Sequence, residues 1–385
     1  MLLVAGRLGV TSFGGPIAHI GYFRDEYVTR RRWLGEEDFG DLVGLCQLLP
    51  GPASSQLGIA IGTLRAGLLG GLAAWAGFTL PSAAALIALA GGIGGDSLTH
   101  AGWVHGLKLV AVAVVAQAVW SMARSLAPDR PRATMAVVSA LTVLLWTAGL
   151  AQIAVLAAGG LIGWRLLAVS ATGTGRTSLN FGISRRAAVV SLSLFAALLL
   201  ALPLARHATD SHSVAMADSF YRSGALVFGG GHVVLPLLQT QVVHPGWVSE
   251  QDFLAGYGAA QAVPGPLFTF AGYLGAVQSP SPNHIAGGAI ALAAIFLPAF
   301  LLVIGAAPFW SGLRGRPSFL AAVAGINAVV VGLLVAALYR PVFTGAVHAP
   351  RDFAVALAAF GLLTLWRLPP WIVVLVCALA GQFLL

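Results

Sequence analysis

The stretch Gln47–Gln56, QLLPGPASSQ, places Pro-Gly-Pro inside an otherwise apolar segment, and this interruption governs how the surrounding segments fold. Pro50 and Pro52 each lack a backbone N–H, and Gly51 adds backbone freedom, so one unbroken helix cannot run through them. We predict that one helix ends near Leu49 and that another begins near Pro52, because proline suits the first helical position. The alternative is a plain proline kink, which membrane helices tolerate without any ligand.

A helix that begins near Pro52 presents free backbone N–H groups and the positive end of its dipole, both of which suit an anion. Ser54, Ser55 and Gln56 add polar side chains to its first turn. Discontinuous helices of this kind form the substrate sites of many secondary transporters near the middle of the bilayer. The sequence therefore predicts an anion site at this break.

The composition excludes an ordinary soluble domain. Of 385 residues, 58% are hydrophobic and only 9% are charged, which indicates an all-α, polytopic integral membrane protein. The formal net charge is +8, but the basic residues cluster in short connections between apolar runs, so no nucleic-acid partner is implied. Cys46 and Cys377 both lie in apolar runs without metal-ligand spacing, and we expect neither a disulfide nor a metal site.

The chain contains thirteen apolar runs. They fall roughly at 1–20, 40–63, 67–95, 103–124, 133–149, 151–168, 187–205, 217–240, 253–277, 284–310, 318–339, 353–366 and 369–385. Most of these runs belong to a duplicated unit. Gln261–Pro266, QAVPGP, restates the first motif at an offset of 214, which also joins Trp33 to Trp247 and Phe39 to Phe253. We predict two homologous six-segment repeats, 1–168 and 217–385, joined by a linker, 169–216, that contains an unpaired transmembrane helix at 187–205.

An unpaired crossing between two such repeats turns the second upside down, which predicts inverted repeats. The arginine content of equivalent loops agrees. The first loop contains Arg24 and Arg30–Arg32, whereas its counterpart, Gln239–Asp252, contains no Lys or Arg. Because cytoplasmic connections are enriched in Lys and Arg, the two loops are expected on opposite sides of the membrane.

The arginines divide best if the first two segments of each half are broken or re-entrant, which leaves nine full crossings and a cytoplasmic N-terminus. Sixteen arginines then face the cytoplasm: Arg7, Arg24, Arg30, Arg31, Arg32, Arg65, Arg124, Arg130, Arg132, Arg165, Arg176, Arg185, Arg186, Arg314, Arg316 and Arg367. Arg206, Arg222, Arg340 and Arg351 remain outside, the last two as visible misfits. Thirteen full crossings would divide the arginines less sharply, at twelve to eight.

Each half also carries a glycine motif ahead of its Pro-Gly-Pro: Phe13–Pro16 in the first half and Phe228–His232 in the second. Glycine allows close approach of the backbone to a ligand, although close helix packing is the usual role of a single membrane glycine. Paired occurrence favours function. The predicted substrate-binding residues are Phe13, Gly14, Gly15, Pro16, Gln47, Pro50, Gly51, Pro52, Ser54, Ser55, Gln56, Phe228, Gly229, Gly230, Gly231, His232, Gln261, Pro264, Gly265 and Pro266.

Ionisable groups near these breaks are candidates for charge balance or proton coupling, because such groups are costly inside a membrane. They are His19, Glu26, Asp41 and Lys108. His19 and His232 are not equivalent in the repeat, and each could instead be a satisfied core group. Lys108, the only lysine, could balance an anion or extend to the interface. Most of the charged stretch around Glu26 has the composition of an interfacial helix.

These residues resemble the chromate ion transporter (CHR) family. The resemblance covers both halves, as in the long, two-domain members of that family. It is carried by Thr11–Pro16, His19, Glu26–Val28, Arg31–Leu34, Phe39, Asp41–Leu42, Gln47–Pro52 and Gln56, with the echoes Phe228–His232 and Pro264–Pro266. It implies a multi-pass protein of the inner (plasma) membrane that exports chromate, with sulfate as a structural analogue. The membrane potential or the proton gradient would drive export, and chromate resistance would result.

Other function classes lack their sequence signatures. The chain has no Walker loop, no His-Glu-x-x-His and no Gly-x-Ser-x-Gly, so we expect no enzyme and no cofactor. A sulfate or other oxyanion carrier is the same-class alternative. A membrane-embedded enzyme would need a polar catalytic constellation, and an anion channel would need a continuous polar lining; neither is apparent. A homo-oligomer remains open.

Overall fold

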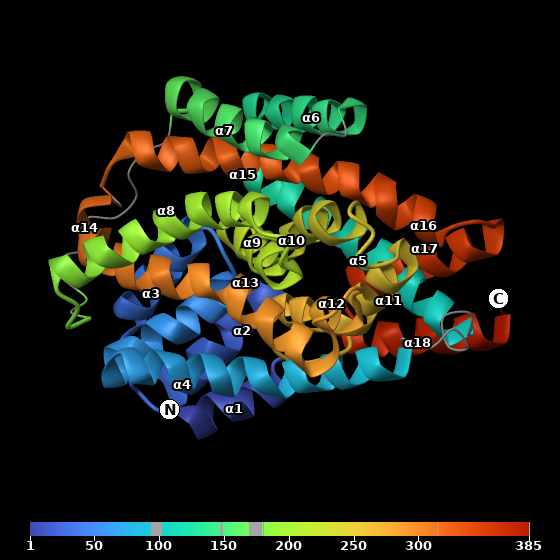
Figure 1. The fold of residues 1–385 in the computed structure, drawn as a ribbon, viewed down its shortest axis with the longest axis horizontal. Helices are drawn as coiled ribbons and strands as arrows, with labels where there is room; N and C mark the ends of the chain where they lie inside the picture. The colour runs from blue at the N-terminus through green and yellow to red at the C-terminus, as the bar shows by residue number, and fades with distance from the viewer. Residues whose placement is uncertain (94–101, 147–148, 169–178, 180, 314, 385) are drawn as a thin grey trace.

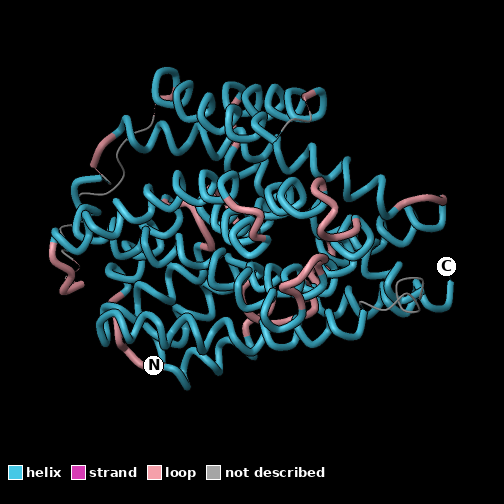
Figure 2. Tube along the Cα trace, in the orientation of Figure 1, coloured by secondary structure: helices cyan, strands magenta, loops and turns pink. Residues whose placement is uncertain are grey.

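The computed structural model describes residues 1–93, 102–146, 149–168, 179, 181–313 and 315–384. These residues form helices and connecting loops, with no strand among them (Figure 2). The all-α fold class expected from the sequence is therefore confirmed.

The first half contains seven α-helices and one π-helical turn: α1 (Leu2–Thr11), α2 (Gly15–Phe23), η1 (Arg24–Arg30), α3 (Glu36–Leu48), α4 (Ala53–Ile93), α5 (Gly102–Leu126), α6 (Arg130–Leu145) and α7 (Gly149–Leu166). Helix α8 (Arg185–Ala208) follows. The second half is more finely divided: α9 (His212–Ala225), η2 (Gly231–Val233), α10 (Val234–Leu238), η3 (Gln239–Val243), α11 (Glu250–Ala260), η4 (Leu267–Thr269), α12 (Phe270–Val277), α13 (His284–Ala306), η5 (Ala307–Phe309), α14 (Trp310–Leu313), α15 (Pro317–Ala337), η6 (Leu338–Phe343), α16 (Thr344–Ala346), α17 (Pro350–Thr364) and α18 (Pro370–Leu384).

Helix α4 is two helices joined by a sharp turn. Ala66 and Gly67 both leave the helical region, and Gly67 adopts a φ of +64°. The two arms then fold back on each other. They approach so closely that any side chain at Gly62 would overlap the carbonyl of Gly70. The expected separation of the apolar runs 40–63 and 67–95 is thus confirmed.

Among the described residues, five stretches are long and apolar enough to cross a membrane: Ala53–Gly91, Gly102–Leu126, Arg185–Ala208, His284–Phe309 and Pro317–Ala346. Helix α8 is the least buried of them and exposes apolar side chains such as Val190 and Leu200. Exposed apolar side chains on a membrane helix face lipid. The unpaired helix therefore lies at the periphery of the bundle.

The two halves are interlocked through their long helices. Helix α5 of the first half packs against α17 and α18 of the second, while α15 of the second half packs against α6 and α7 of the first (Figure 1). Small residues allow these close approaches. Any side chain at Gly106 of α5 would overlap the carbonyl of Cys377 in α18, and one at Gly325 of α15 would overlap that of Gly159 in α7.

Two apolar clusters form the core. The larger one joins α5, α9–α13 and α15, so it contains residues of both halves. The smaller one joins the broken segments α1–α4 around the fully buried rings of Phe23, Tyr27 and Phe78, with Trp310 at its edge. The inner faces of the broken segments are therefore held by packing, while outer side chains such as Leu3 and Leu69 stay exposed.

Candidate functional site

The first Pro-Gly-Pro motif (Pro50–Pro52) breaks the chain as the sequence predicts. Helix α3 ends at Leu48, Leu49 is extended, and α4 begins at Ala53. Gly51 adopts a φ of +122°, which side-chain-bearing residues rarely adopt, so this position requires glycine. The Gln56 side chain closes the loop, because its Nε2 donates to the Pro50 carbonyl over 2.7 Å.

The second Pro-Gly-Pro motif (Pro264–Pro266) repeats the break with a different continuation. Gly265 adopts a φ of +98°, and Pro266 is extended. The 3₁₀ turn η4 then precedes α12, and Thr269 Oγ1 donates to the Pro266 carbonyl over 2.7 Å. A side chain at Gly265 would come within 2.8 Å of Ser82 Oγ and 3.1 Å of the Phe78 carbonyl.

The two glycine motifs also interrupt helices. Gly14 and Gly15 adopt φ values of +103° and +83° between α1 and α2, and Gly229 and Gly230 adopt +79° and +142° between α9 and η2. These values lie in the region that glycine favours. All four breaks therefore contain glycine at a positive φ. Close helix packing alone does not require a positive φ.

Two reciprocal backbone hydrogen bonds join the four breaks in two pairs, each pair with one break from each half. We call these segments the joined breaks. Gly51 N donates to the Val227 carbonyl over 2.6 Å, and Gly265 N donates to the Ser12 carbonyl over 2.9 Å. Val227 and Ser12 directly precede the glycine motifs, and they are equivalent at the offset of 215. Each half therefore uses its Pro-Gly-Pro glycine to hold the glycine motif of the other half. Because the N–H groups of Gly51 and Gly265 already donate in these bonds, they are not available to a ligand. Backbone donors for an anion must come from the helix starts that follow each Pro-Gly-Pro motif.

Buried polar atoms without a hydrogen-bond partner gather on these segments. They are Ser12 Oγ, Ser55 Oγ, Gln56 Oε1, both ring nitrogens of His19, and Gln261 Nε2. An unsatisfied buried polar group costs roughly 1–3 kcal/mol. A ligand with several acceptor oxygens would relieve most of these costs at once, since hydroxyls, an imidazole N–H and an amide can all donate.

His19 and His232 have different surroundings. His19, on α2, is buried and packs edge-on against Phe78, with ring centroids 5.3 Å apart. The Phe78 carbonyl also neighbours Gly265, so His19 lies close to the joined breaks. His232 Nδ1 instead lies 2.7 Å from the hydroxyl of Tyr257 on α11. His19 lies next to the backbone of Ser12, the residue that accepts from Gly265 N.

Glu26 is held in ion pairs outside the broken helices. Its carboxylate accepts from Arg31 Nε over 2.7 Å and from Arg30 Nη1 over 3.1 Å. Burial opposes ionisation, yet these two hydrogen bonds keep the pKa of Glu26 below its ordinary value. The group therefore stays ionised near neutral pH, which suits a structural role better than proton exchange.

The remaining ionisable candidates do not meet at the joined breaks. Lys108 on α5 is buried, and its Nζ lies 3.5 Å from Gln251 Oε1 at the start of α11. Gln251 and Gln261 are ten residues apart along α11, or about 15 Å at 1.5 Å per residue. Asp41 lies half-buried on α3. Gln47 is exposed near the end of α3, although its repeat partner Gln261 is half-buried.

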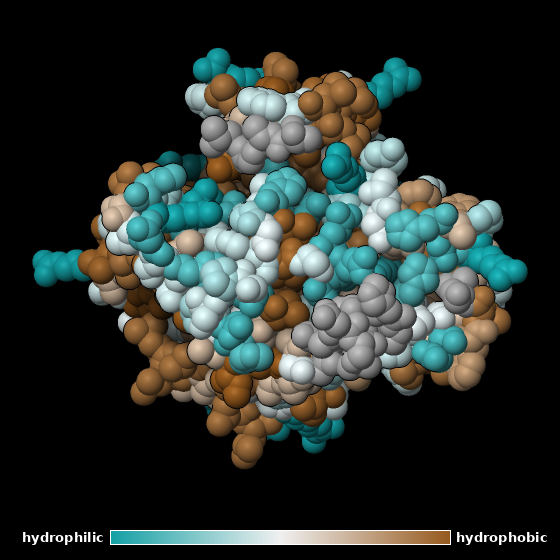
Figure 3. Space-filling view, turned by 45° about the vertical axis from the view of Figure 1, so that its right-hand side comes forward, coloured by the Kyte–Doolittle hydropathy of each residue, from teal (hydrophilic) through white to brown (hydrophobic). Residues whose placement is uncertain are grey.

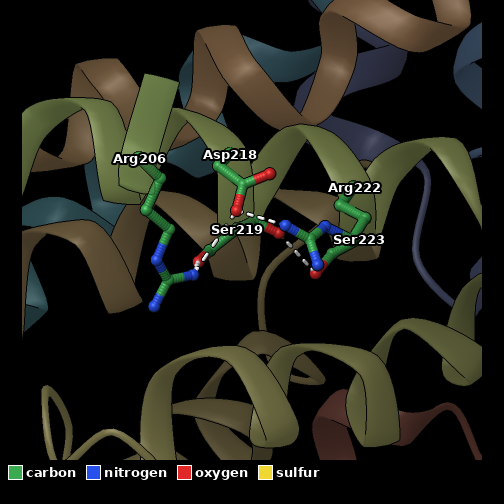
Figure 4. A network of polar contacts seen from close by, with 5 residues as sticks. All are labelled: Arg206, Asp218, Ser219, Arg222 and Ser223. Atoms are coloured by element: carbon green, nitrogen blue, oxygen red, sulfur yellow. Dashed lines mark hydrogen bonds and ion pairs between the residues drawn. The ribbon is translucent and has the colours of Figure 1, made fainter. Parts of the chain in front are cut away.

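Sequence reasoning missed a charged network on α9. Asp218 is 1% exposed and pairs with Arg222 one turn along the helix and with Arg206 of α8, whose Nη1 lies 3.4 Å from its Oδ2 (Figure 4). Arg206 also donates to Ser219 Oγ over 3.3 Å. An Asp in an apolar run was the available signal, since a buried carboxylate requires a partner.

Ser12 and Ser82 also enter the site without having been singled out as binding residues. Ser12 offers a buried hydroxyl and the carbonyl that holds Gly265, and Ser82 borders the same glycine. Their place follows from cross-half contacts, which repeat alignment alone does not reveal.

Comparison with known proteins agrees with the resemblance. A family model described as "Chromate transporter" matches residues 1–164 and 214–382. The probable chromate transport protein of Synechococcus elongatus is 29% identical over 97% of this chain and 92% of its own length. The chromate transport protein of Pseudomonas aeruginosa is 28% identical over 76% of this chain and 69% of its own length, and that of Cupriavidus metallidurans is 26% identical over 86% and 79%. No solved structure matches the chain.

Proposed function

The chain belongs to the chromate transporter family, and we propose that it is a secondary carrier that exports chromate, a tetrahedral oxyanion, across the inner membrane. The membrane potential or the proton gradient drives export, and chromate resistance is the consequence. The observation that carries this proposal is the pair of reciprocal hydrogen bonds, Gly51 N to Val227 O and Gly265 N to Ser12 O, which ties the Pro-Gly-Pro break of each half to the glycine-motif break of the other.

Recognition of the dianion combines backbone and side-chain donors. The first N–H groups of α4 have no intrahelical acceptors, and the helix dipole adds positive potential there. The buried, unpartnered hydroxyls of Ser55 and Ser12 supply further donors. The buried His19 ring, which lies beside the Ser12 backbone, supplies an N–H. Hydrogen bonds to a charged group in a dry site are stronger than those between neutral groups. Because sulfate has the same shape and charge, it is the alternative substrate.

We further propose that the two halves are inverted repeats, with the four broken segments re-entrant and the remaining nine segments crossing the bilayer. The reciprocity of the hydrogen bonds supports this, since a two-fold relation between the halves makes each contact occur twice. Four of the five spanning-length stretches fall wholly among the nine, and the fifth, Ala53–Gly91, contributes its arm after Gly67. Inversion allows the bundle to open to either side by rocking one half against the other, with the anion held at the joined breaks.

The substrate proposal is tested by counterflow in proteoliposomes with labelled chromate and labelled sulfate in turn. Vesicles preloaded with the unlabelled anion should transiently accumulate the label, and protein-free vesicles should not. Movement of sulfate but not chromate would reassign the substrate. Failure to move either anion, with protein inserted, would sink the carrier proposal.

The topology proposal is tested with Thr29→Cys in the first loop and Ser249→Cys in its counterpart. Both positions are exposed, and the native Cys46 and Cys377 are buried, so background labelling is low. An impermeant thiol reagent on intact cells should label Ser249→Cys and spare Thr29→Cys until the cells are opened. Equal labelling of both in intact cells would rule out inversion.

A further inference from the structure

A cavity of about 360 Å³, lined by both apolar and polar side chains, opens beside the second glycine motif, away from the joined breaks. It lies between the end of α6, the start of α7, the α10–η3 segment and the end of α15. Its polar side chains are Gln152, Gln239, Thr240, His244 and Arg340. Among the described residues that line it, none is acidic, so the cavity presents donors and a positive charge.

Two elements connect the cavity to the central site. Pro236 lines the cavity and stands on α10, five residues after Gly231, or about 7–8 Å along a helix. Leu333 lines the cavity from α15, and one turn earlier Val330 lies against Gly229. A ligand in the cavity would therefore rest next to the second glycine motif, one step from the joined breaks.

One wall is fixed by hydrogen bonds. Gln152 is buried, and its Nε2 donates to Thr240 Oγ1 over 2.9 Å and to the Pro236 carbonyl over 3.3 Å. Thr240 Oγ1 in turn donates to the Pro236 carbonyl over 3.0 Å. These bonds satisfy the wall itself. Arg340, His244 and Gln239 remain as the groups that can donate to a ligand.

Arg340 carries the charge of the cavity. It was a misfit in the arginine distribution, because it falls on the side that should be poor in basic residues. Arg206 and Arg222 on that side share the carboxylate of Asp218, which compensates one of their two charges, whereas Arg340 makes no ion pair with the described residues. The helix leaves α-geometry at Arg340, which is extended at φ −134° before Pro341. An unneutralised guanidinium at the mouth of a donor-lined cavity is suited to an oxyanion.

The cavity lies at the end of the molecule where the proposed topology puts the extracytoplasmic side. That end contains α16, the start of α17 and the C-terminus, at the right of Figure 1, while α3 and α14 lie at the left. Figure 3 brings this end forward and shows hydrophilic residues gathered across the middle of the face. Arg340 and His244, which line the cavity, are exposed, so water and dissolved anions can reach it.

We propose that this cavity is a second oxyanion site, an extracytoplasmic vestibule in which Arg340 holds the anion next to the central site. The proposal rests on the carrier function proposed above, since the vestibule serves the same substrate class. An anionic lipid phosphate shares this chemistry and is the competing source of ligand. For an exporter, the vestibule receives the anion after it leaves the joined breaks.

Direct occupancy is tested with a reporter cysteine, Leu144→Cys, in purified protein in neutral phosphatidylcholine nanodiscs. Leu144 lines the cavity and is 39% exposed, but it is not a proposed donor. Sodium sulfate should slow its reaction with an uncharged thiol reagent at least fivefold relative to sodium chloride of equal ionic strength. Sulfate is used because chromate oxidises thiols. Ser249→Cys, exposed at the same end but outside the cavity, should react equally in both salts.

Arg340→Gln in the Leu144→Cys background should abolish the protection, and Arg340→Lys should retain part of it. An unchanged Ser249→Cys rate in the Arg340→Gln protein shows that the fold persists. Equal rates in sulfate and chloride with Arg340 intact, or protection that survives Arg340→Gln, would overturn the vestibule. Protection by phosphatidylglycerol nanodiscs, without any effect of sulfate in neutral lipid, would assign the cavity to a lipid phosphate and also overturn it.

Transport then separates the vestibule from the carrier function. In oriented proteoliposomes, Arg340→Gln should raise the half-saturating oxyanion concentration about tenfold at the extracytoplasmic face and less than twofold at the cytoplasmic face. Arg351→Gln, which removes the other misfit arginine, should change neither. If sulfate protects the Leu144→Cys reporter with Arg340 intact, but the wild type carries no oxyanion, the carrier proposal fails and the binding site stands. If it carries oxyanion without protection, only the vestibule fails.

Discussion

The two Pro-Gly-Pro motifs share a backbone and differ in chemistry. Both glycines adopt a positive φ, and both donate to the residue that precedes the glycine motif of the other half. After Pro52 the chain enters an α-helix whose first turn carries Ser54, Ser55 and Gln56, all buried. After Pro266 it enters a 3₁₀ turn. Duplication has kept the geometry that joins the halves while the first-turn side chains have diverged.

The residues that follow the second motif pack among aromatic rings. Phe268 packs against Phe296, and Phe270 packs against Phe253 and Tyr257. The hydroxyl of the turn that follows the motif, on Thr269, already donates to the Pro266 carbonyl. We infer that the first half supplies most side-chain contacts to the dianion, and that the second half supplies backbone N–H groups and a dry wall.

The largest expected effect is loss of transport in Gly51→Leu with the protein still inserted. The substitution forces a φ of +122° on a bulky residue and fills the approach to the helix start, where its Cβ would lie 2.8 Å from Gln56 Nε2. Counterflow should fall at least 100-fold. Gly91→Leu, on the same helix with open space around it, is the matched control and should transport normally. Normal flux in Gly51→Leu would reduce the motif to a structural kink.

A smaller effect is expected from the double variant Ser54→Ala, Ser55→Ala. Each lost hydrogen bond to a charged ligand costs roughly 1–2 kcal/mol, so together they should raise the half-saturating chromate concentration about 10-fold or more. Initial rates of counterflow over a range of chromate concentrations measure this.

The matched change in the second half is Thr269→Ala, and it should raise the half-saturating concentration less than twofold. The reason is that the Thr269 hydroxyl serves the Pro266 carbonyl rather than the ligand. If Thr269→Ala weakens binding as much as the double serine variant does, the division of labour is wrong and the site is chemically symmetric.

The smallest effect concerns stability. Glu26 has a lowered pKa because of Arg31 and Arg30, and its repeat counterpart Gln241 is neutral. The ion pairs therefore stabilise the folded state at neutral pH, and this contribution is lost as the pH falls below the ordinary glutamate range near 4. Glu26→Gln should lower the free energy of unfolding by about 1 kcal/mol at pH 7.

Thermal midpoints in detergent at several pH values check this. The difference between Glu26→Gln and the wild type should shrink as the pH falls below about 4. Asp25→Asn, a neighbouring exposed carboxylate without those hydrogen bonds, should shift the midpoint much less. A Glu26→Gln deficit that persists undiminished at pH 3 would show that packing, rather than charge, explains it.

Much of the fold could be predicted because the relevant forces are local. Apolar length located the long helices, and Pro-Gly-Pro located the breaks at Leu49–Pro52 within about one residue. The turn at Ala66–Gly67 lies where the predicted apolar runs 40–63 and 67–95 meet, next to the charge at Arg65. The family and its transport class were correct.

The site could be predicted only in part, because its decisive contacts cross between the halves. No local pattern indicates that Gly51 pairs with Val227, or that Ser82 borders Gly265. Lys108 and Glu26 were candidates by residue type alone, and their partners give them other surroundings. Burial and pairing are tertiary properties, and they decide whether an ionisable group is available to a ligand.

The interlocking of α5 with α17 and α18, and of α15 with α6 and α7, has a consequence for biosynthesis. When the ribosome has completed α7, the faces of α5, α6 and α7 that face the second half still lack their partners. Until α18 has been synthesised, these faces of the first repeat must therefore be covered by lipid or by chaperones. Coexpressed fragments 1–168 and 169–385 should accordingly assemble with each other, while either fragment alone should be degraded by quality control.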